Sequence, residues 1–86
     1  MYEIIWNSDA KAELKLIFRQ SEDPDGLITT LALLQKELRT VPLLAGFGRE
    51  SSVHRMHYQR PLFIEYEVIE DDKRVIVLSV LEYHGN

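Results

Sequence analysis

Residues 64–80 read IEYEVIEDDKRVIVLSV, two β-rich runs joined by an acidic turn. In the first run, Leu62–Ile69, apolar and polar side chains alternate, as in a strand with one buried face. Glu70–Lys73 predicts the hairpin turn that follows it. The second run, Arg74–Tyr83, is apolar on both faces, which indicates a strand that is central in a sheet or covered on one face from outside the chain. The face of the first run that we expect to be buried carries Leu62, Ile64, Tyr66 and Val68, and the other carries Phe63, Glu65 and Glu67.

Two further strands extend the expected sheet outward from this hairpin. Val53–Tyr58 is β-rich and precedes the hairpin directly. Tyr2–Trp6 alternates between its two faces and predicts a short strand near the N-terminus. Pro42–Ser52, which contains Gly46 and Gly48, predicts a loop.

The segment between the first strand and this loop predicts two amphipathic helices. Any of Asn7, Ser8 and Asp9 can accept a hydrogen bond from the first helical turn, and the first helix is expected to run to about Arg19. The polar stretch Ser21–Gly26 breaks the pattern and predicts a tight link, so the helices should pack as an antiparallel hairpin. The second helix should end at Val41–Pro42, because a residue before proline avoids the α conformation. The apolar residues at helical spacing are Ala10, Leu14, Ile17 and Phe18 in the first helix and Leu27, Leu31, Leu34 and Leu38 in the second.

The predicted order is thus β-α-α-β-β-β, an α+β fold in which a helical hairpin covers one face of a small, mostly antiparallel sheet. With 86 residues, the chain is expected to form a single domain over residues 1–86.

Composition narrows the classes of function. The absence of cysteine excludes disulfides, thiolate metal sites and a cysteine nucleophile, and it fits a cytoplasmic protein. No apolar run is long enough for a membrane span, and the N-terminus lacks the basic segment of a signal peptide, so no membrane association is expected. The net charge of -4 disfavours strong, autonomous nucleic-acid binding. We expect no cofactor and no metal, because Gly46-Phe47-Gly48 lacks the lysine and helix of a phosphate-binding loop and nothing completes a ligand set around Glu65 and Glu67.

Three stretches resemble toxins of the RelE/ParE superfamily from bacterial type II toxin–antitoxin systems. Tyr2–Ala10 is similar to the strand, tryptophan, cap and helical alanine that open the family, and Leu38–Pro42 is similar to its exit from the second helix. Residues 64–80 match its tyrosine-centred strand, acidic turn and valine-rich last strand. The resemblance covers nearly the whole chain, but it consists of residue types rather than invariant signatures. It implies a growth-inhibiting toxin, neutralised by and assembling with a cognate antitoxin, that acts on mRNA at the ribosome (RelE-like) or on DNA gyrase (ParE-like).

Five residues are the candidates for a ribonuclease site: Arg55, His57, Arg60, Tyr83 and His84. Cleavage of RNA at a 2′-hydroxyl requires a base, an acid and cations for the phosphorane charge. We expect Met56 and Tyr58 to face the core, which would turn Arg55 outward as a phosphate clamp. His57 or His84 would then carry the proton. The alternative is that these are ordinary polar residues on an exposed edge strand.

The resemblance also contains departures that bear on activity. Tyr83-His84 is similar to the histidine and tyrosine that end some nuclease members. However, Phe63 stands where active members usually carry an arginine, and Leu81-Glu82 stands where a further arginine is common. Three possibilities therefore remain: a ribosome-dependent endoribonuclease, a gyrase inhibitor without an active site of its own, and a toxin-like domain that serves only as an interaction module.

Overall fold

The computed structural model describes residues 1–40, 42, 47–48 and 54–84. The elements follow the predicted order, with one short additional strand inside the predicted loop. Apart from Pro42, the rest of that loop lies outside the described residues, as does Val53. The elements are β1 (Glu3–Trp6), α1 (Ser8–Gln20), α2 (Pro24–Thr40), β2 (Phe47–Gly48), β3 (His54–Gln59), β4 (Leu62–Ile69) and β5 (Arg74–Glu82).

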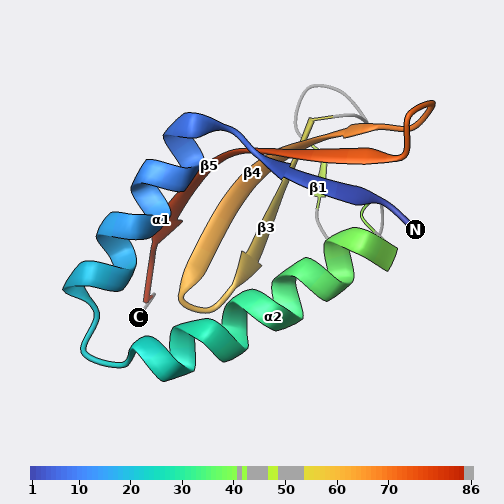
Figure 1. Cartoon of the computed structure of the whole chain (residues 1–86). Coiled ribbons are helices and arrows are strands. Elements are labelled where there is room, and N and C mark those ends of the chain that lie inside the picture. Colours follow the sequence, from blue (N-terminus) through green and yellow to red (C-terminus); the bar gives the residue numbers. More distant parts are fainter. Residues whose placement is uncertain (41, 43–46, 49–53, 85–86) are drawn as a thin grey trace.

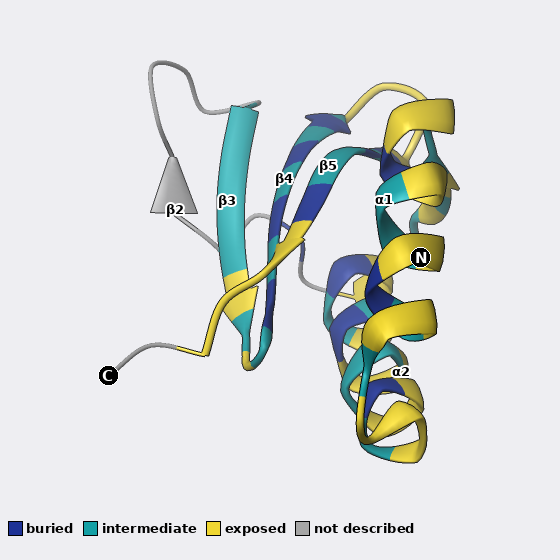
Figure 2. Cartoon of the chain, turned by 90° about the vertical axis from the view of Figure 1, so that its left-hand side faces the viewer, coloured by how far each residue is buried: buried dark blue, intermediate teal, exposed yellow. Residues whose placement is uncertain are grey.

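The strands form one sheet in the order β1-β5-β4-β3-β2. β5 pairs in parallel with β1 and antiparallel with β4, and the remaining pairs are antiparallel. The apolar last strand is therefore internal in the sheet, as its sequence indicated. The α+β architecture with a mostly antiparallel sheet is confirmed. Both helices lie on the same side of β3, β4 and β5, and they diverge from their link as a V (Figures 1 and 2).

The helix termini are set by local capping. Asn7 caps α1, because its side-chain oxygen accepts the Ala10 N–H at 2.8 Å. The prediction that Pro24 to Gly26 belong to the link was wrong, since α2 begins at Pro24. Proline is favoured in the first turn of a helix, and the Asp23 carboxylate accepts the Gly26 N–H at 3.1 Å. Among the described residues, no helix is long and apolar enough to cross a membrane.

The core lies between the helices and one face of the sheet. On β4 the predicted alternation is confirmed, with every second residue from Leu62 to Val68 buried. Tyr66 is fully buried, its hydroxyl donates to the Pro42 carbonyl at 2.7 Å, and burial raises the pKa of this phenol. The other buried apolar residues are Ala10, Ile17, Leu27, Leu34, Leu38, Val75, Val77 and Val80.

An irregularity in the β4–β5 pairing explains how valines on both sides of it reach the core. Glu65 pairs with Ser79, but the next residue, Tyr66, pairs with Val77, so Leu78 has no partner across the ladder. Such a bulge shifts the alternation by one residue. Val75 and Val77 face the core before it and Val80 after it.

Glu13 of α1 accepts a hydrogen bond from a part of β5 that extends beyond the end of β1. The β1–β5 pairing ends at Trp6 and Val77, and the Val80 N–H beyond it donates to the Glu13 carboxylate at 3.0 Å. Glu13→Ala would leave this partly buried N–H without its partner. We expect a loss of about 1–3 kcal/mol in the free energy of unfolding, measured by urea denaturation. Glu13→Gln, which keeps an acceptor, should lose clearly less, and equal losses in the two variants would contradict this role.

The N-terminal residues are tied to the β4–β5 turn by a small polar cluster. The Tyr2 hydroxyl donates to both oxygens of Glu70 at 2.7 and 2.8 Å, and Lys73 Nζ lies 2.6 Å from the same carboxylate and 5.2 Å from the Tyr2 ring centroid. The hydrogen bonds from Lys73 and then Tyr2 lower the pKa of Glu70. The hydrogen bond to Glu70 raises the pKa of Tyr2. Lys73 adopts a left-handed backbone conformation with φ 52°.

The lowered pKa of Glu70 predicts a dependence of stability on pH. A carboxyl whose pKa is lower in the folded state stabilises that state above its unfolded pKa and loses this contribution as pH falls through the folded one. We therefore expect wild type to melt at a higher temperature than Glu70→Gln at neutral pH. The gap should close as the pH falls below about 4.5, the ordinary pKa of this carboxyl. Thermal melts across this range test it, with Glu22→Gln as a control, and a gap that is independent of pH would contradict it.

Candidate functional site

The structure separates the five candidate residues into two groups. Arg55 and His57 lie in β3, on the face of the sheet that the helices cover. Arg60, Tyr83 and His84 lie together at the end of the sheet where the β3–β4 turn meets the end of β5. The five therefore do not converge on one site.

The predicted outward orientation of Arg55 and His57 was wrong. Arg55 pairs with Tyr66 and His57 pairs with Ile64, and directly opposite residues of an antiparallel pair share a face. Both partners are fully buried. The sequence of β3 has no strong alternation of its own, so the apolar face of β4 sets the register, and a shift of one residue would reverse every side chain.

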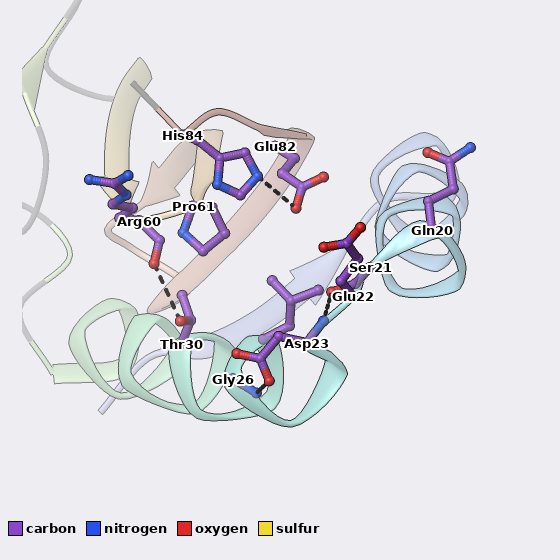
Figure 3. A pocket seen from close by; sticks show the side chains of 11 residues that line it. Gln20, Ser21, Glu22, Asp23, Gly26, Thr30, Arg60, Pro61, Glu82 and His84 are labelled. Atoms are coloured by element: carbon purple, nitrogen blue, oxygen red, sulfur yellow. Dashed lines mark hydrogen bonds and ion pairs between the residues drawn. The ribbon is translucent and has the colours of Figure 1, made fainter. Parts of the chain in front are cut away.

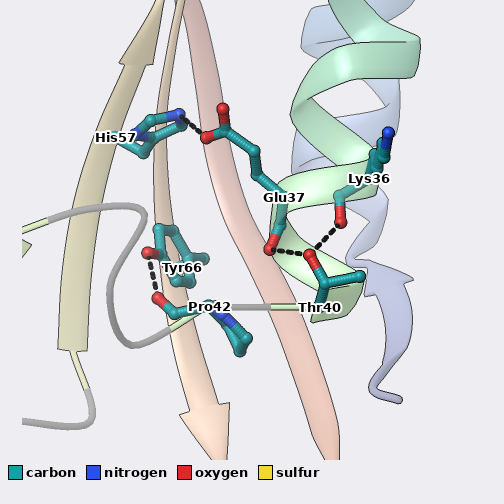
Figure 4. A network of polar contacts seen from close by, with 6 residues as sticks. All are labelled: Lys36, Glu37, Thr40, Pro42, His57 and Tyr66. Atoms are coloured by element: carbon teal, nitrogen blue, oxygen red, sulfur yellow. Dashed lines mark hydrogen bonds and ion pairs between the residues drawn. The ribbon is translucent and has the colours of Figure 1, made fainter.

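His57 connects β3 to α2 rather than to solvent. Its Nε2 lies 3.0 Å from Glu37 Oε2, and its side chain is only 13% exposed, whereas that of Glu37 is 43% exposed (Figure 4). Arg55 lies close enough to Tyr66 to oppose the effect of burial on the pKa of that phenol. These residues form a polar layer between the sheet and the C-terminal half of α2, an arrangement that holds a helix in place.

The second group is organised around the end of β5. The Tyr83 N–H donates to the Pro61 carbonyl at 2.7 Å, and the Tyr83 carbonyl accepts from the Tyr58 hydroxyl at 2.7 Å. His84 Nε2 lies 3.2 Å from Glu82 Oε2, and the Arg60 carbonyl accepts from the Thr30 hydroxyl at 3.3 Å (Figure 3). Both His84 and Tyr83 are exposed.

An open cavity of about 620 Å³ lies beside this group, between the α1–α2 link and the ends of the strands. Arg60 and His84 line it, but so do the three carboxylates of Glu22, Asp23 and Glu82. In Figure 3 the Arg60 guanidinium extends away from the His84–Glu82 pair. A phosphate in this cavity would meet more negative than positive charge, which is the opposite of what phosphoryl chemistry requires.

The face of the sheet away from the helices carries a set of residues that the sequence had not brought together. We call it the open face and define it by three rows of directly opposed residues. These rows are His54, Glu67 and Ile76; Met56, Glu65 and Ser79; and Tyr58, Phe63 and Leu81. The placement of Phe63, Glu65 and Glu67 on this side was predicted, whereas that of Met56 and Tyr58 in the core was wrong.

The open face is apolar at one end and acidic at the other. The Tyr58 ring centroid lies 6.1 Å from that of Phe63 and 5.9 Å from that of Tyr83, and Leu81 is 52% exposed beside them. In the middle row, Glu65 Oε2 lies 2.6 Å from His54 Nε2. The nine residues thus contain two carboxylates and, as their one basic group, an imidazole already paired to one of them. Among the described residues, no cluster of three side chains fits a metal ion.

Comparisons with known proteins find solved structures that are similar to this one, but no similar sequence. No family model and no curated protein sequence matches it. A chain of the RelBE2 toxin–antitoxin complex from Mycobacterium tuberculosis superposes with a TM-score of 0.76 at 17% identity, covering 98% of this chain and 93% of that one. A chain of the chromosomal ParDE system from P. aeruginosa gives 0.69 at 19% identity, covering 98% of each chain. The isolated E. coli RelE toxin gives 0.67 at 19% identity, covering 100% of this chain and 88% of that one. The chain therefore has the fold of the RelE/ParE toxins, as the resemblance of its sequence implied.

Proposed function

We propose that the chain is the toxin of a type II toxin–antitoxin pair and that a cognate antitoxin neutralises it. In this proposal it inhibits growth by binding a protein target, and DNA gyrase is the first candidate. The observation that carries the proposal is the composition of the open face, which is apolar and acidic where a nuclease would need cations. The fold shared with RelE and ParE structures supports the toxin role.

The charges of the open face argue against catalysis on RNA. Phe63 and Leu81, two positions where the family resemblance would have placed arginines, are directly opposite each other in the apolar row. The acidic residues of the other rows would repel a phosphate backbone, and the chain as a whole carries -4. Binding of a protein partner needs no such cations, because burial of apolar surface is the main favourable term in most protein–protein association.

Exposed apolar residues of this face, together with the adjacent Tyr83, also support binding by an antitoxin. Leu81 is 52% exposed, Tyr83 54% and Tyr58 37%, and they lie next to one another. Adjacent exposed apolar residues of this kind are typical of a surface that another protein covers.

Expression of the chain alone in a bacterium tests the proposal. We expect growth to stop and to recover when the small protein encoded by the neighbouring reading frame is co-expressed. With purified components, the chain should reduce supercoiling of relaxed plasmid by gyrase and leave translation of a reporter mRNA unaffected. Normal growth of the expressing cells would contradict the toxin role, and it would favour a domain that serves only for interaction.

Cleavage of mRNA at the ribosome is the second candidate. It is favoured by one observation, the clustering of Arg60, Tyr83 and His84 at one end of the sheet. Because the acidic chain lacks distributed phosphate contacts, the ribosome would have to supply the geometry of the substrate. Primer extension on translated mRNA would then show cuts that are absent from naked RNA, and gyrase would be unaffected.

A further inference from the structure

We infer that the antitoxin segment that covers the open face is apolar at one position and basic four residues further along, so that it complements the face in both polarity and charge. This inference rests on the proposed function. It adds the chemistry of the partner, which follows from how the three rows of the open face are arranged.

The apolar end of the face presents adjacent aromatic and aliphatic side chains to a partner. Tyr58, Phe63 and Leu81 lie side by side across three strands, and the Tyr83 ring extends the row. The hydroxyl of Tyr58 is already used by the Tyr83 carbonyl at 2.7 Å, so what these side chains present to a partner is mainly ring and methyl surface. An apolar side chain placed here would remove this surface from water.

The acidic end of the face offers a carboxylate for a cation. Glu67 lies in the row of His54 and Ile76 and is only partly exposed. Among the described residues, no ion pair or hydrogen bond uses the Glu67 side chain, whereas the other carboxylate of the face, Glu65, is already paired with His54. A lysine or arginine of the partner would pair with Glu67, and the partner itself would shield this ion pair from water. Such a pair makes binding specific, because a partner with a different charge at this position would be disfavoured.

The spacing of the two ends sets the pattern for a partner segment that lies extended along β4. Phe63 and Glu67 are four residues apart on β4, or about 13 Å at the rise of an extended strand. An extended segment that follows β4 would therefore reach both ends with residues i and i+4, which point to the same side. The charges favour a protein segment over RNA, because every phosphate would approach Glu65 and Glu67.

Binding of the co-expressed, purified neighbouring protein to four variants of the full chain tests the inference. We expect Leu81→Ala to weaken binding about tenfold and Glu67→Lys at least tenfold, the latter with a loss of the salt dependence seen in wild type. Leu33→Ala on α2 is the matched control for the first, since Leu33 is 49% exposed and Leu81 52%. Glu22→Lys in the α1–α2 link is the control for the second, with the same change in net charge. Both controls should bind as wild type does.

The outcomes separate this inference from the function on which it rests. If the unaltered chain does not bind the neighbouring protein, the proposed pairing is wrong and the inference falls with it. If it binds but Leu81→Ala and Glu67→Lys bind equally well, only the docking surface is wrong. Tighter binding of the partner by Glu67→Lys would show that the partner carries no lysine or arginine opposite Glu67. Binding of a single-stranded RNA probe by wild type as tight as its binding of the protein would contradict the preference for a protein segment.

Discussion

Truncation of Leu34 to alanine is expected to cost about 2–5 kcal/mol of the free energy of unfolding. Leu34 is fully buried at the centre of α2, where it packs against the sheet, and a small domain cannot fill the cavity that its removal would leave. A domain of this size has a total stability of roughly 4–13 kcal/mol. The variant should therefore lose a large share of its stability and unfold at a much lower urea concentration.

The neighbouring residue provides the control. Leu33 is 49% exposed in the same helix, so Leu33→Ala changes the helix propensity by the same amount but leaves no cavity. We expect its stability to stay within about 0.5 kcal/mol of wild type. Comparable losses for the two variants would show that the buried side of α2 has been assigned to the wrong residues.

Where the sequence carried a strong period, it predicted the fold correctly. The alternation in Leu62–Ile69 identified the buried face of β4, and the leucines of α2 identified its buried side. These patterns are reliable because one face of each element must leave water, and no other arrangement of the same residues would bury as much apolar surface. The apolar character of β5 indicated either a central position in the sheet or a face covered from outside the chain, and the structure shows the central position.

Where the period was weak, the prediction failed. The β3 sequence HRMHYQ offers Met56 and Tyr58 as apolar residues on one face, and on this ground they were assigned to the core. The structure instead turns them to the open face, because the register with β4 places Arg55 and His57 opposite core residues. The polar pair is tolerated there because Glu37 of α2 lies 3.0 Å from His57. A partner so far away in sequence cannot be read from the strand itself.

The candidate site could be predicted only in part, because it too depends on contacts between residues that are distant in the sequence. Arg60, Tyr83 and His84 were singled out by residue type, and the structure does bring them to one end of the sheet. The carboxylates of Glu22 and Asp23 at the same place come from the α1–α2 link, far away along the chain. The open face depends on register as well, since its rows combine residues of three strands.

The second large effect is expected for Tyr58, at the centre of the apolar end of the open face. Tyr58→Ala removes the ring that lies 6.1 Å from Phe63 and 5.9 Å from Tyr83, together with the hydrogen bond to the Tyr83 carbonyl. Aromatic residues at the centre of an interface often contribute 2 kcal/mol or more, so we expect binding of the target to weaken by about 30-fold. Growth arrest should then require much higher expression of the toxin.

This loss should not be a loss of the fold. Tyr58 is 37% exposed and packs outside the core, so the circular dichroism spectrum of Tyr58→Ala should remain native. The loss of its ring contacts and hydrogen bond should cost about 1 kcal/mol of stability, less than the loss expected for Leu34→Ala. Tyr58→Phe keeps the ring and should retain most of the activity. Arg55→Ala, three residues earlier on the same strand, should instead lower the urea midpoint and leave the open face intact. Arg55 lies on the helix-covered face beside the buried Tyr66. If Tyr58→Ala keeps full toxicity with a native spectrum, the open face does not bind the target.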